Sequence, residues 1–241
     1  SDKTFTINAN EGYEIFQVLV DGQDVGSVDS YTFENVRANH NIEVLFTTAS
    51  DSQQTLFTDV DHTAWYAKAV SYVAQAGIMN GTSDTTFSPN AGLTRGMMAQ
   101  ILYNLEGRPT DSGADAFLDV PSSLWCATAV NWASSEGIVN GYTSDCFGPE
   151  NLVTREQLAV MLFNYAAFKG YDTTSRGTLN TFSDGSVTSD WAEEAMAWAN
   201  GIGVLNGKSG NLLDPQGNAT RAEVAVILMR FCEVMSQDKS L

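Results

Sequence analysis

The chain has 241 residues, of which 29 are acidic and 12 are basic, so its formal net charge at neutral pH is −17. A charge of this sign excludes a nonspecific nucleic-acid binder, because such proteins bind phosphates through clustered lysines and arginines. Apolar residues make up 43% of the chain, which is enough to bury a core. No run approaches the ~18–20 apolar residues of a membrane span, and the first residues lack the apolar run of a signal peptide. We therefore expect no membrane insertion, and a segment of a longer protein.

Residues 1–48 have the composition of a small all-β module. Four runs in this segment are rich in β-branched and aromatic residues, and Asp21-Gly22 is a hairpin turn signal. The expected strands are 4–8, 14–20, 30–36 and 41–47. The polar residues that follow predict a linker over 49–56.

The rest of the chain contains three copies of one pattern, at residues 57–107, 117–170 and 182–233. Each copy has an Asp after an opening Phe, then a Trp, an Asn-Gly pair, a Pro and a Thr-Arg pair. The Trp, Pro and Thr all move by 60 residues from the first copy to the second and by 66 from the second to the third. Such a uniform shift indicates a repeated supersecondary unit.

Each copy predicts two helices joined by a glycine-rich loop, forming a helical hairpin. The first helix follows from helical spacing, and Gly77 is placed to end it in a left-handed cap; in the first copy the spaced residues are Trp65, Ala69, Val70, Val73 and Ala76. The second helix starts at a Thr N-cap. Gln157 and Glu223 complete a capping box in copies two and three, whereas Gly96 and Met97 do not in copy one. We expect the start of that helix to be the least stable and Arg95 to be the least fixed arginine.

The cysteines and histidines predict no metal site and no cofactor. Three cysteines and two histidines are present, and no two cysteines stand at Cys-x-x-Cys spacing. Cys126 and Cys146 lie 20 residues apart, which permits a disulfide; buried free thiols are the alternative.

The ordered landmarks resemble the S-layer homology (SLH) motif of bacterial surface proteins, in three tandem copies over about 175 residues. The resemblance implies a mainly α fold, a pseudo-threefold spindle of three helical-hairpin repeats. It also implies an extracellular location at the cell wall or S-layer, and grooves between repeats that bind a secondary cell-wall polysaccharide, often pyruvylated. The first 48 residues look like the C-terminal part of a β-rich repeat found in stalks of bacterial surface proteins.

The resemblance also implies a set of glycan-binding residues. Arginines would read a carboxylate, tryptophans would wall the groove, aspartates would hold hydroxyls or the scaffold, and glycines would allow close backbone approach. These residues are Arg95, Arg155, Arg221, Trp65, Trp125, Trp191, Asp59, Asp119, Asp184, Gly81, Gly141 and Gly207.

Each set also has a structural interpretation from the residues alone. A Trp at helical spacing is commonly core, an Asp before a helix is commonly a cap, and a Gly after a helix commonly serves a positive φ. The arginines are harder to explain structurally, because each follows an N-cap Thr, at the positive end of the helix dipole. A salt bridge to a neighbouring acid is the alternative for them.

The function that we expect is noncatalytic anchoring to a cell-wall glycan. The adjacent acids Glu193 and Glu194 point apart on a helix, and two unrelated histidines build no nucleophilic triad, so we expect no enzyme. Because the charge of −17 repels an anionic polymer, single-site binding should be weak and strengthened by multivalency. The alternative is a protein-interaction module that has lost glycan binding and either self-associates or contacts a host surface protein.

Overall fold

The computed structural model describes residues 2–10, 13–21, 23–33, 36–48, 56–110 and 116–238. The chain divides into two compact units, Ser1–Leu56 and Phe57–Leu241. Of the expected linker over 49–56, residues 49–55 lie outside the described part. No helix among the described residues has the length and apolar character needed to cross a membrane.

The described residues of the N-terminal unit form five strands in two antiparallel sheets. The strands are β1 (Lys3–Thr6), β2 (Tyr13–Val20), β3 (Gln23–Asp24), β4 (Ser30–Phe33) and β5 (Ile42–Thr48). One sheet pairs β1 with β4, and the other has the order β3-β2-β5, with a bulge in β2 between Ile15 and Gln17. Asp21 adopts a left-handed conformation (φ 51°) in the predicted turn, and Gly22 lies outside the described residues. The two-residue strand β3 was not among the expected strands. Among the side chains that the structure describes here, four are buried and form a small core: Ile7, Val18, Val20 and Phe33.

The C-terminal unit contains six α-helices in its described part, two from each repeat. They are α2 (Ala67–Gln75), α3 (Arg95–Leu105), α4 (Ala127–Ser135), α5 (Arg155–Phe168), α6 (Glu193–Gly201) and α7 (Arg221–Asp238), with two 3₁₀ turns, Leu179–Thr181 and Gly185–Val187. The mainly α class is therefore confirmed for this unit. Gly77 follows α2 with φ 67°, as expected of a left-handed cap. Trp65 was expected inside the first helix and lies before it, because α2 begins at Ala67.

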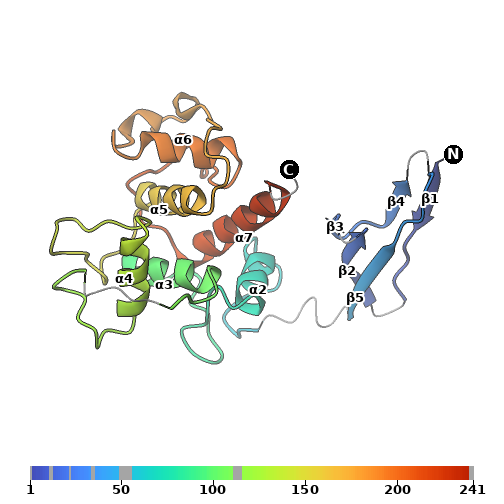
Figure 1. Ribbon diagram of the computed structural model, residues 1–241, viewed down its shortest axis with the longest axis horizontal. Helices are drawn as coiled ribbons and strands as arrows, with labels where there is room; N and C mark the ends of the chain where they lie inside the picture. Colours follow the sequence, from blue (N-terminus) through green and yellow to red (C-terminus); the bar gives the residue numbers. More distant parts are fainter. Residues whose placement is uncertain are drawn as a thin grey trace. The chain divides into compact units, whose positions relative to one another are not determined.

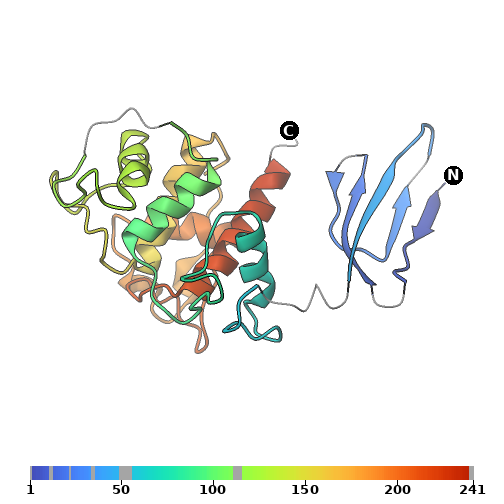
Figure 2. The same cartoon turned by 90° about the horizontal axis from the view of Figure 1, so that it is seen from below.

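The expected helical hairpins are wrong in one respect. Each close helix pair joins two repeats: α3 packs against α4, α5 against α6, and α7 against α2. Figures 1 and 2 both show the red helix α7 beside the teal helix α2, so the end of the third repeat lies against the start of the first. The glycine-rich loop between the two helices of a repeat is long enough to send them to different neighbours.

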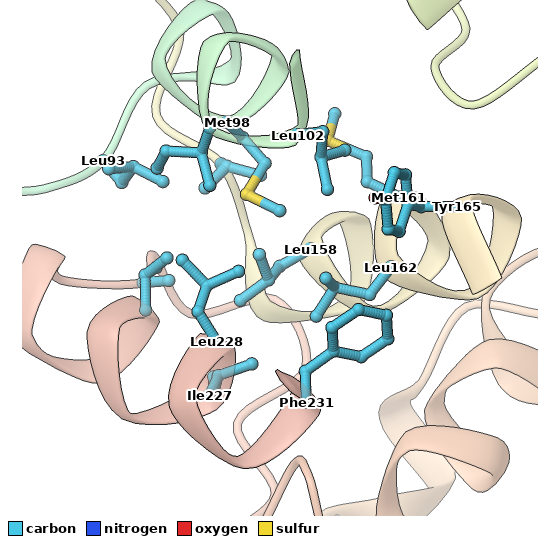
Figure 3. Packing of buried hydrophobic residues seen from close by; sticks show 14 of the residues in the cluster. Leu93, Met98, Leu102, Leu158, Met161, Leu162, Tyr165, Ile227, Leu228 and Phe231 are labelled. Atoms are coloured by element: carbon cyan, nitrogen blue, oxygen red, sulfur yellow. The ribbon is translucent and has the colours of Figure 1, made fainter. Parts of the chain in front are cut away.

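The second helices of the three repeats share one apolar core. Figure 3 shows side chains from α3, α5 and α7 converging on a common centre. Met98, Leu102, Leu158, Leu162 and Leu228 are fully buried there. Because burial of one such side chain contributes ~1.5–3 kcal/mol, and each repeat supplies only part of this cluster, the repeats should be stable together rather than singly.

Candidate binding grooves between the repeats

The start of each second helix is hydrogen-bonded to the loop of the next repeat. The Arg95 and Gly96 amides donate to the carbonyls of Asn151 and Pro149, both at 2.9 Å, and the starts of α5 and α7 bind the third and first loops in the same way. These amides have no partner within their own helix, so the neighbouring loop satisfies them. The repeats therefore cap one another in a cyclic order.

A closed ring of three hydrogen bonds lies where the repeats meet. Leu93 donates its amide to Ala219 (3.0 Å), Ala219 to Val153 (3.0 Å), and Val153 to Leu93 (2.9 Å). Each of these residues immediately precedes the N-cap Thr of the second helix in its own repeat. The ring ties residues more than a hundred positions apart in the sequence.

The capping boxes are present in the second and third repeats and incomplete in the first, as expected. The Thr154 and Thr220 amides each bind the side chain three residues on, whereas Thr94 only accepts a hydrogen bond from Met97 N. The expectation that Arg95 is the least fixed of the three arginines is wrong, because equivalent inter-repeat hydrogen bonds hold the starts of α3, α5 and α7. Gly96 also has a packing role, since a Cβ there would lie 3.0 Å from both Cys126 Sγ and Pro149 O.

The three motif arginines are buried, with 3–6% of their surface exposed, and they join adjacent repeats. Arg95 donates from Nε to Phe147 O (2.9 Å) and from Nη2 to Asn140 O (2.6 Å). Arg155 binds Leu213 O and Asn206 O, and Arg221 binds Phe87 O and Asn80 O, with the same atoms. The hydrogen-bond partners are thus carbonyls of the next loop, and the alternative of a neighbouring acid does not describe them. Burial lowers the pKa of all three guanidiniums from its usual value, although they remain charged at neutral pH.

Aromatic rings flank two of these arginines. The Arg95 guanidinium lies 4.5 Å from the ring centres of both Tyr142 and Phe147, and that of Arg221 lies 4.5 Å from Phe87. The third loop has Leu213 at the corresponding place, so Arg155 lacks this ring. Cation–π contact partly offsets the cost of burying the charge for Arg95 and Arg221.

The motif aspartates hold the loops from the other side. Asp119 accepts hydrogen bonds from the amides of Phe147 (2.8 Å) and Gly148 (2.7 Å). Asp59 and Asp184 bind the equivalent pairs of amides in their own loops. Phe147 therefore gives its amide to Asp119 and its carbonyl to Arg95, and one peptide segment links two repeats. Burial raises the pKa of Asp119, but the two amide hydrogen bonds outweigh it and hold that pKa below its usual value; the same holds for Asp184.

The motif glycines allow close packing inside their own repeats. A Cβ on Gly141 would lie 2.4 Å from Thr143 O and 2.5 Å from the Phe117 ring, and Gly81 and Gly207 approach Phe57 and Phe182 equally closely. None of the three has a positive φ; that conformation belongs to the helix-ending glycines, such as Gly137 at 70°. At Gly81, Gly141 and Gly207 the backbone thus closely approaches other atoms of the same repeat.

The motif tryptophans are exposed, with 68% of Trp65, 53% of Trp125 and 58% of Trp191 accessible. The alternative that they are core residues is therefore wrong. Two of them reach grooves that also contain a motif arginine. Trp191 and Arg95 line one groove of about 540 Å³, which we call the Tyr142 groove, and Trp125 and Arg221 line another of about 420 Å³, which we call the Arg108 groove.

Both grooves are built from equivalent elements. Each is formed by an Asn-Gly loop and the exposed face of a second helix, and each receives a Trp from the following repeat and an Arg from the remaining one. The Tyr142 groove is further lined by Ile138, Val139, Asn140, Gly141, Tyr142, Gln157, Val160, Met161 and Asn164. The Arg108 groove is further lined by Ile78, Met79, Asn80, Gly81, Thr82, Met97, Gln100, Ile101, Asn104 and Arg108. Among the described residues, neither groove has an acidic side chain in its lining.

The third repeat differs at the equivalent position. Lys208 follows its Asn-Gly pair, where Tyr142 and Thr82 follow theirs. Its ammonium group lies 3.0 Å from Glu223, in the first turn of α7, and 2.8 Å from Asp214. An ion pair therefore spans the loop and the helix here, whereas the equivalent residues are neutral in the other two repeats: Tyr142 and Gln157, and Thr82 and Met97.

The disulfide that the spacing of Cys126 and Cys146 permits is not formed in this structure, in which all three cysteines are free, as in the alternative. Cys126 is buried beside Gly96, and burial raises the pKa of its thiol to about 11. Cys146 is exposed on the second loop, where its Sγ donates to Asp119 Oδ2 at 3.4 Å. The two thiols thus face different surroundings.

The sequence pattern missed several groove residues. Tyr142, Gln157 and Arg108 do not recur in all three copies, so a search for repeated landmarks passes over them. Asn104 and Asn164 do occupy equivalent places, and each donates to a carbonyl three residues after the end of its repeat's first helix, Ile78 O or Ile138 O at 3.2 Å. Their helical spacing from the motif arginines was the available signal.

Buried arginines, loop-clamping aspartates and exposed tryptophans at grooves define a class of protein: a tandem-repeat module whose repeats interlock in cyclic order. The S-layer homology domain matches the chain three times, at residues 56–99, 116–159 and 181–225, which is more than half of its length. The chain belongs to the S-layer homology family.

The chain is similar to parts of much longer proteins. It is 32% identical over 170 residues to an amylopullulanase of Thermoanaerobacterium thermosulfurigenes, covering 70% of this chain and 9% of that protein. It is 28% identical over 179 residues to the surface-layer 125 kDa protein of Lysinibacillus sphaericus (73% and 15%), and 25% identical over 169 residues to the S-layer protein EA1 of Bacillus anthracis (70% and 19%). The chain therefore spans less than a fifth of the length of each of these relatives.

Proposed function

We propose that the C-terminal unit is a noncatalytic anchor that holds a longer protein at the bacterial cell wall, outside the cell, by binding a secondary cell-wall polysaccharide. The observation that carries the proposal is the pair of inter-repeat grooves, each with an exposed Trp, a motif Arg and no acid among its described lining residues. In a chain with a net charge of −17, a groove that lacks acids is a local exception that suits an anionic ligand.

The ligand that fits these grooves is a sugar that carries a carboxylate, such as a pyruvylated sugar. An indole face packs against the apolar face of a sugar ring, and the amides of Asn, Gln and main-chain groups suit its hydroxyls. The motif Arg supplies positive charge at the groove wall, although its Nε and Nη2 atoms are engaged. Asp59, Asp119 and Asp184 hold the scaffold in this proposal, since their carboxylates already accept two loop amides each.

The cyclic contacts between repeats favour a pseudo-threefold arrangement, which presents several grooves to one polymer. Each groove is open and small, so we expect weak single-site binding that multivalency strengthens. The relatives support the location, because two of them are surface-layer or S-layer proteins and another, an amylopullulanase, is a large enzyme of which this chain matches a small part.

The test is cosedimentation of the full chain with purified cell walls and with the same walls stripped of their secondary polymer. We expect binding to the first and loss of binding to the second. The Trp125→Ala/Trp191→Ala double variant should bind less, whereas Tyr13→Ala, at an exposed aromatic of the N-terminal unit, should not. Equal binding to stripped walls would reject the polysaccharide and favour the protein-interaction module, with self-association or a host surface protein as its partner.

A further inference from the structure

The two grooves differ in charge. Among the described lining residues, the Arg108 groove has two arginines, Arg108 and Arg221, whereas the Tyr142 groove has one, Arg95. Since the described lining of both grooves lacks acids, the second arginine makes the Arg108 groove the more cationic of the two. A carboxylate should therefore prefer the Arg108 groove.

The two arginines of this groove have different donors to offer. Arg221 is 6% exposed and gives Nε and Nη2 to the carbonyls of Phe87 and Asn80. Arg108 is exposed, and the structure records one hydrogen bond for its guanidinium within the described part of the chain, from Nε to Asn104 Oδ1 at 3.0 Å. A planar fork reads a carboxylate through two parallel N–H groups, and neither terminal amino group of Arg108 is hydrogen-bonded to another described residue.

Neighbouring side chains hold Arg108 in place. Asn104 Oδ1 also accepts from Gln100 Nε2 (3.1 Å), and Asn104 Nδ2 donates to Ile78 O (3.2 Å) at the groove wall. Gln100, Asn104 and Arg108 are spaced four residues apart, so they form a row of polar groups that ends on the guanidinium. The hydrogen bond to Asn104 occupies Nε of Arg108 and restricts the orientation of its guanidinium.

The backbone at Arg108 adopts a conformation that helix termination does not require. Gly107 ends α3 with φ 81°, yet Arg108 also has a positive φ, of 60°. At the equivalent place in the second repeat, after α5, Gly170 has a positive φ (73°), whereas Tyr171, which follows it, does not. A left-handed non-glycine residue costs ~1–2 kcal/mol. The dipole of α3 favours a cation at its C-terminus, but this accounts for the charge and not for the backbone conformation.

We infer that Arg108 reads the carboxylate of the ligand and makes the Arg108 groove the preferred binding groove of this protein. The inference rests on the proposed glycan-binding function and adds which groove and which fork carry the specificity. Arg221 has a different role, since it binds the carbonyls of Phe87 and Asn80 and so fixes the loop that forms the groove wall.

The test is calorimetric titration of the full chain with a pyruvylated wall saccharide, and with the same saccharide after acid removal of its pyruvate. Arg108→Gln should weaken binding of the pyruvylated saccharide by about five- to tenfold and leave the depyruvylated one unchanged. The affinity of Arg108→Lys for the pyruvylated saccharide should lie between those of the wild type and Arg108→Gln, because lysine keeps the charge and lacks the planar guanidinium. Arg37→Gln makes the same charge change in the N-terminal unit and should match the wild type.

A fourth variant separates binding from folding. Arg108→Gly suits the left-handed backbone, so its Tm should not fall below that of the wild type, while its binding should fall as for Arg108→Gln. Equal binding by Arg108→Gln and Arg37→Gln would overturn the role of Arg108 and leave the proposed function intact. Absence of any binding by the wild type would instead overturn both.

Discussion

The buried junction between repeats and the exposed grooves draw on the same repeated motif but use its residues differently. At the junction, Arg155 has 3% of its surface exposed and binds two carbonyls of the next loop. At the groove, Trp125 is 53% exposed beside a cavity. Both residue types occur at the same place in all three copies, so recurrence alone does not separate residues that hold the fold from residues available to a ligand. Burial and hydrogen bonding separate them.

The largest expected effect concerns the junction. Arg155→Ala removes a buried guanidinium and leaves Leu213 O and Asn206 O without their partner, which should lower the free energy of unfolding by ~3–5 kcal/mol. Arg155→Lys, which keeps the charge, should cost ~2–3 kcal/mol because it cannot reach both carbonyls in the same geometry. Urea unfolding followed by helical circular dichroism measures both, with exposed Lys68→Ala as the control. Wild-type stability for both arginine variants would contradict a structural role at the junction.

A matched pair of glycines gives the next effect. Gly141→Ala places a Cβ 2.4 Å from Thr143 O and should cost ~2–3 kcal/mol, because backbone and the Phe117 ring must move. At Gly137 a Cβ meets nothing within 4 Å, so Gly137→Ala should cost only the ~1 kcal/mol of a left-handed alanine. Thermal unfolding of the two variants compares them directly. If Gly137→Ala were the more harmful, close packing would not be the reason for the glycine in the Asn-Gly pair.

The aspartate clamp should make stability depend on acid. The pKa of Asp119 and Asp184 is lowered in the folded state, so their contribution is complete above the unfolded pKa of ~3.9 and is lost as pH falls through the folded pKa. Stability should therefore decrease below about pH 4. Asp119→Ala should cost ~1–2 kcal/mol at pH 7 and less at pH 2.5, as measured by urea unfolding at both values. A cost that does not change with pH would show that the ionised carboxylate is not what holds the loop.

The smallest expected effect on stability is at the groove. Trp125→Ala should change the free energy of unfolding by less than ~1 kcal/mol, because the side chain is half exposed. The same variant should weaken binding of a pyruvylated wall saccharide by about tenfold through loss of the aromatic wall. Titration and unfolding of one preparation give both numbers. A strongly destabilised Trp125→Ala would move this residue from the groove to the scaffold.

Much of the organisation of this protein follows from the sequence. The repeat landmarks predicted three units, helix ends at Gly77 and its equivalents, and Thr N-caps before Arg95, Arg155 and Arg221. These features are local, because a cap or a left-handed turn depends on residues a few positions apart. The β-rich composition of the first 48 residues likewise predicted most of its strands.

Only the tertiary structure decided which repeat each residue serves. Arg221 binds carbonyls 134 and 141 positions away, and no local pattern contains that distance. The first helix of each repeat begins two residues after the motif tryptophan, so Trp65, Trp125 and Trp191 lie outside the helices and helical spacing does not place them in the core. The helices pair between repeats for a related reason: each glycine-rich loop is bound by an Asp of its own repeat and by an Arg of another. Local chemistry thus set the elements of this chain, whereas hydrogen bonds across the repeats set their partners, since a buried carbonyl accepts from whichever donor the packing brings to it.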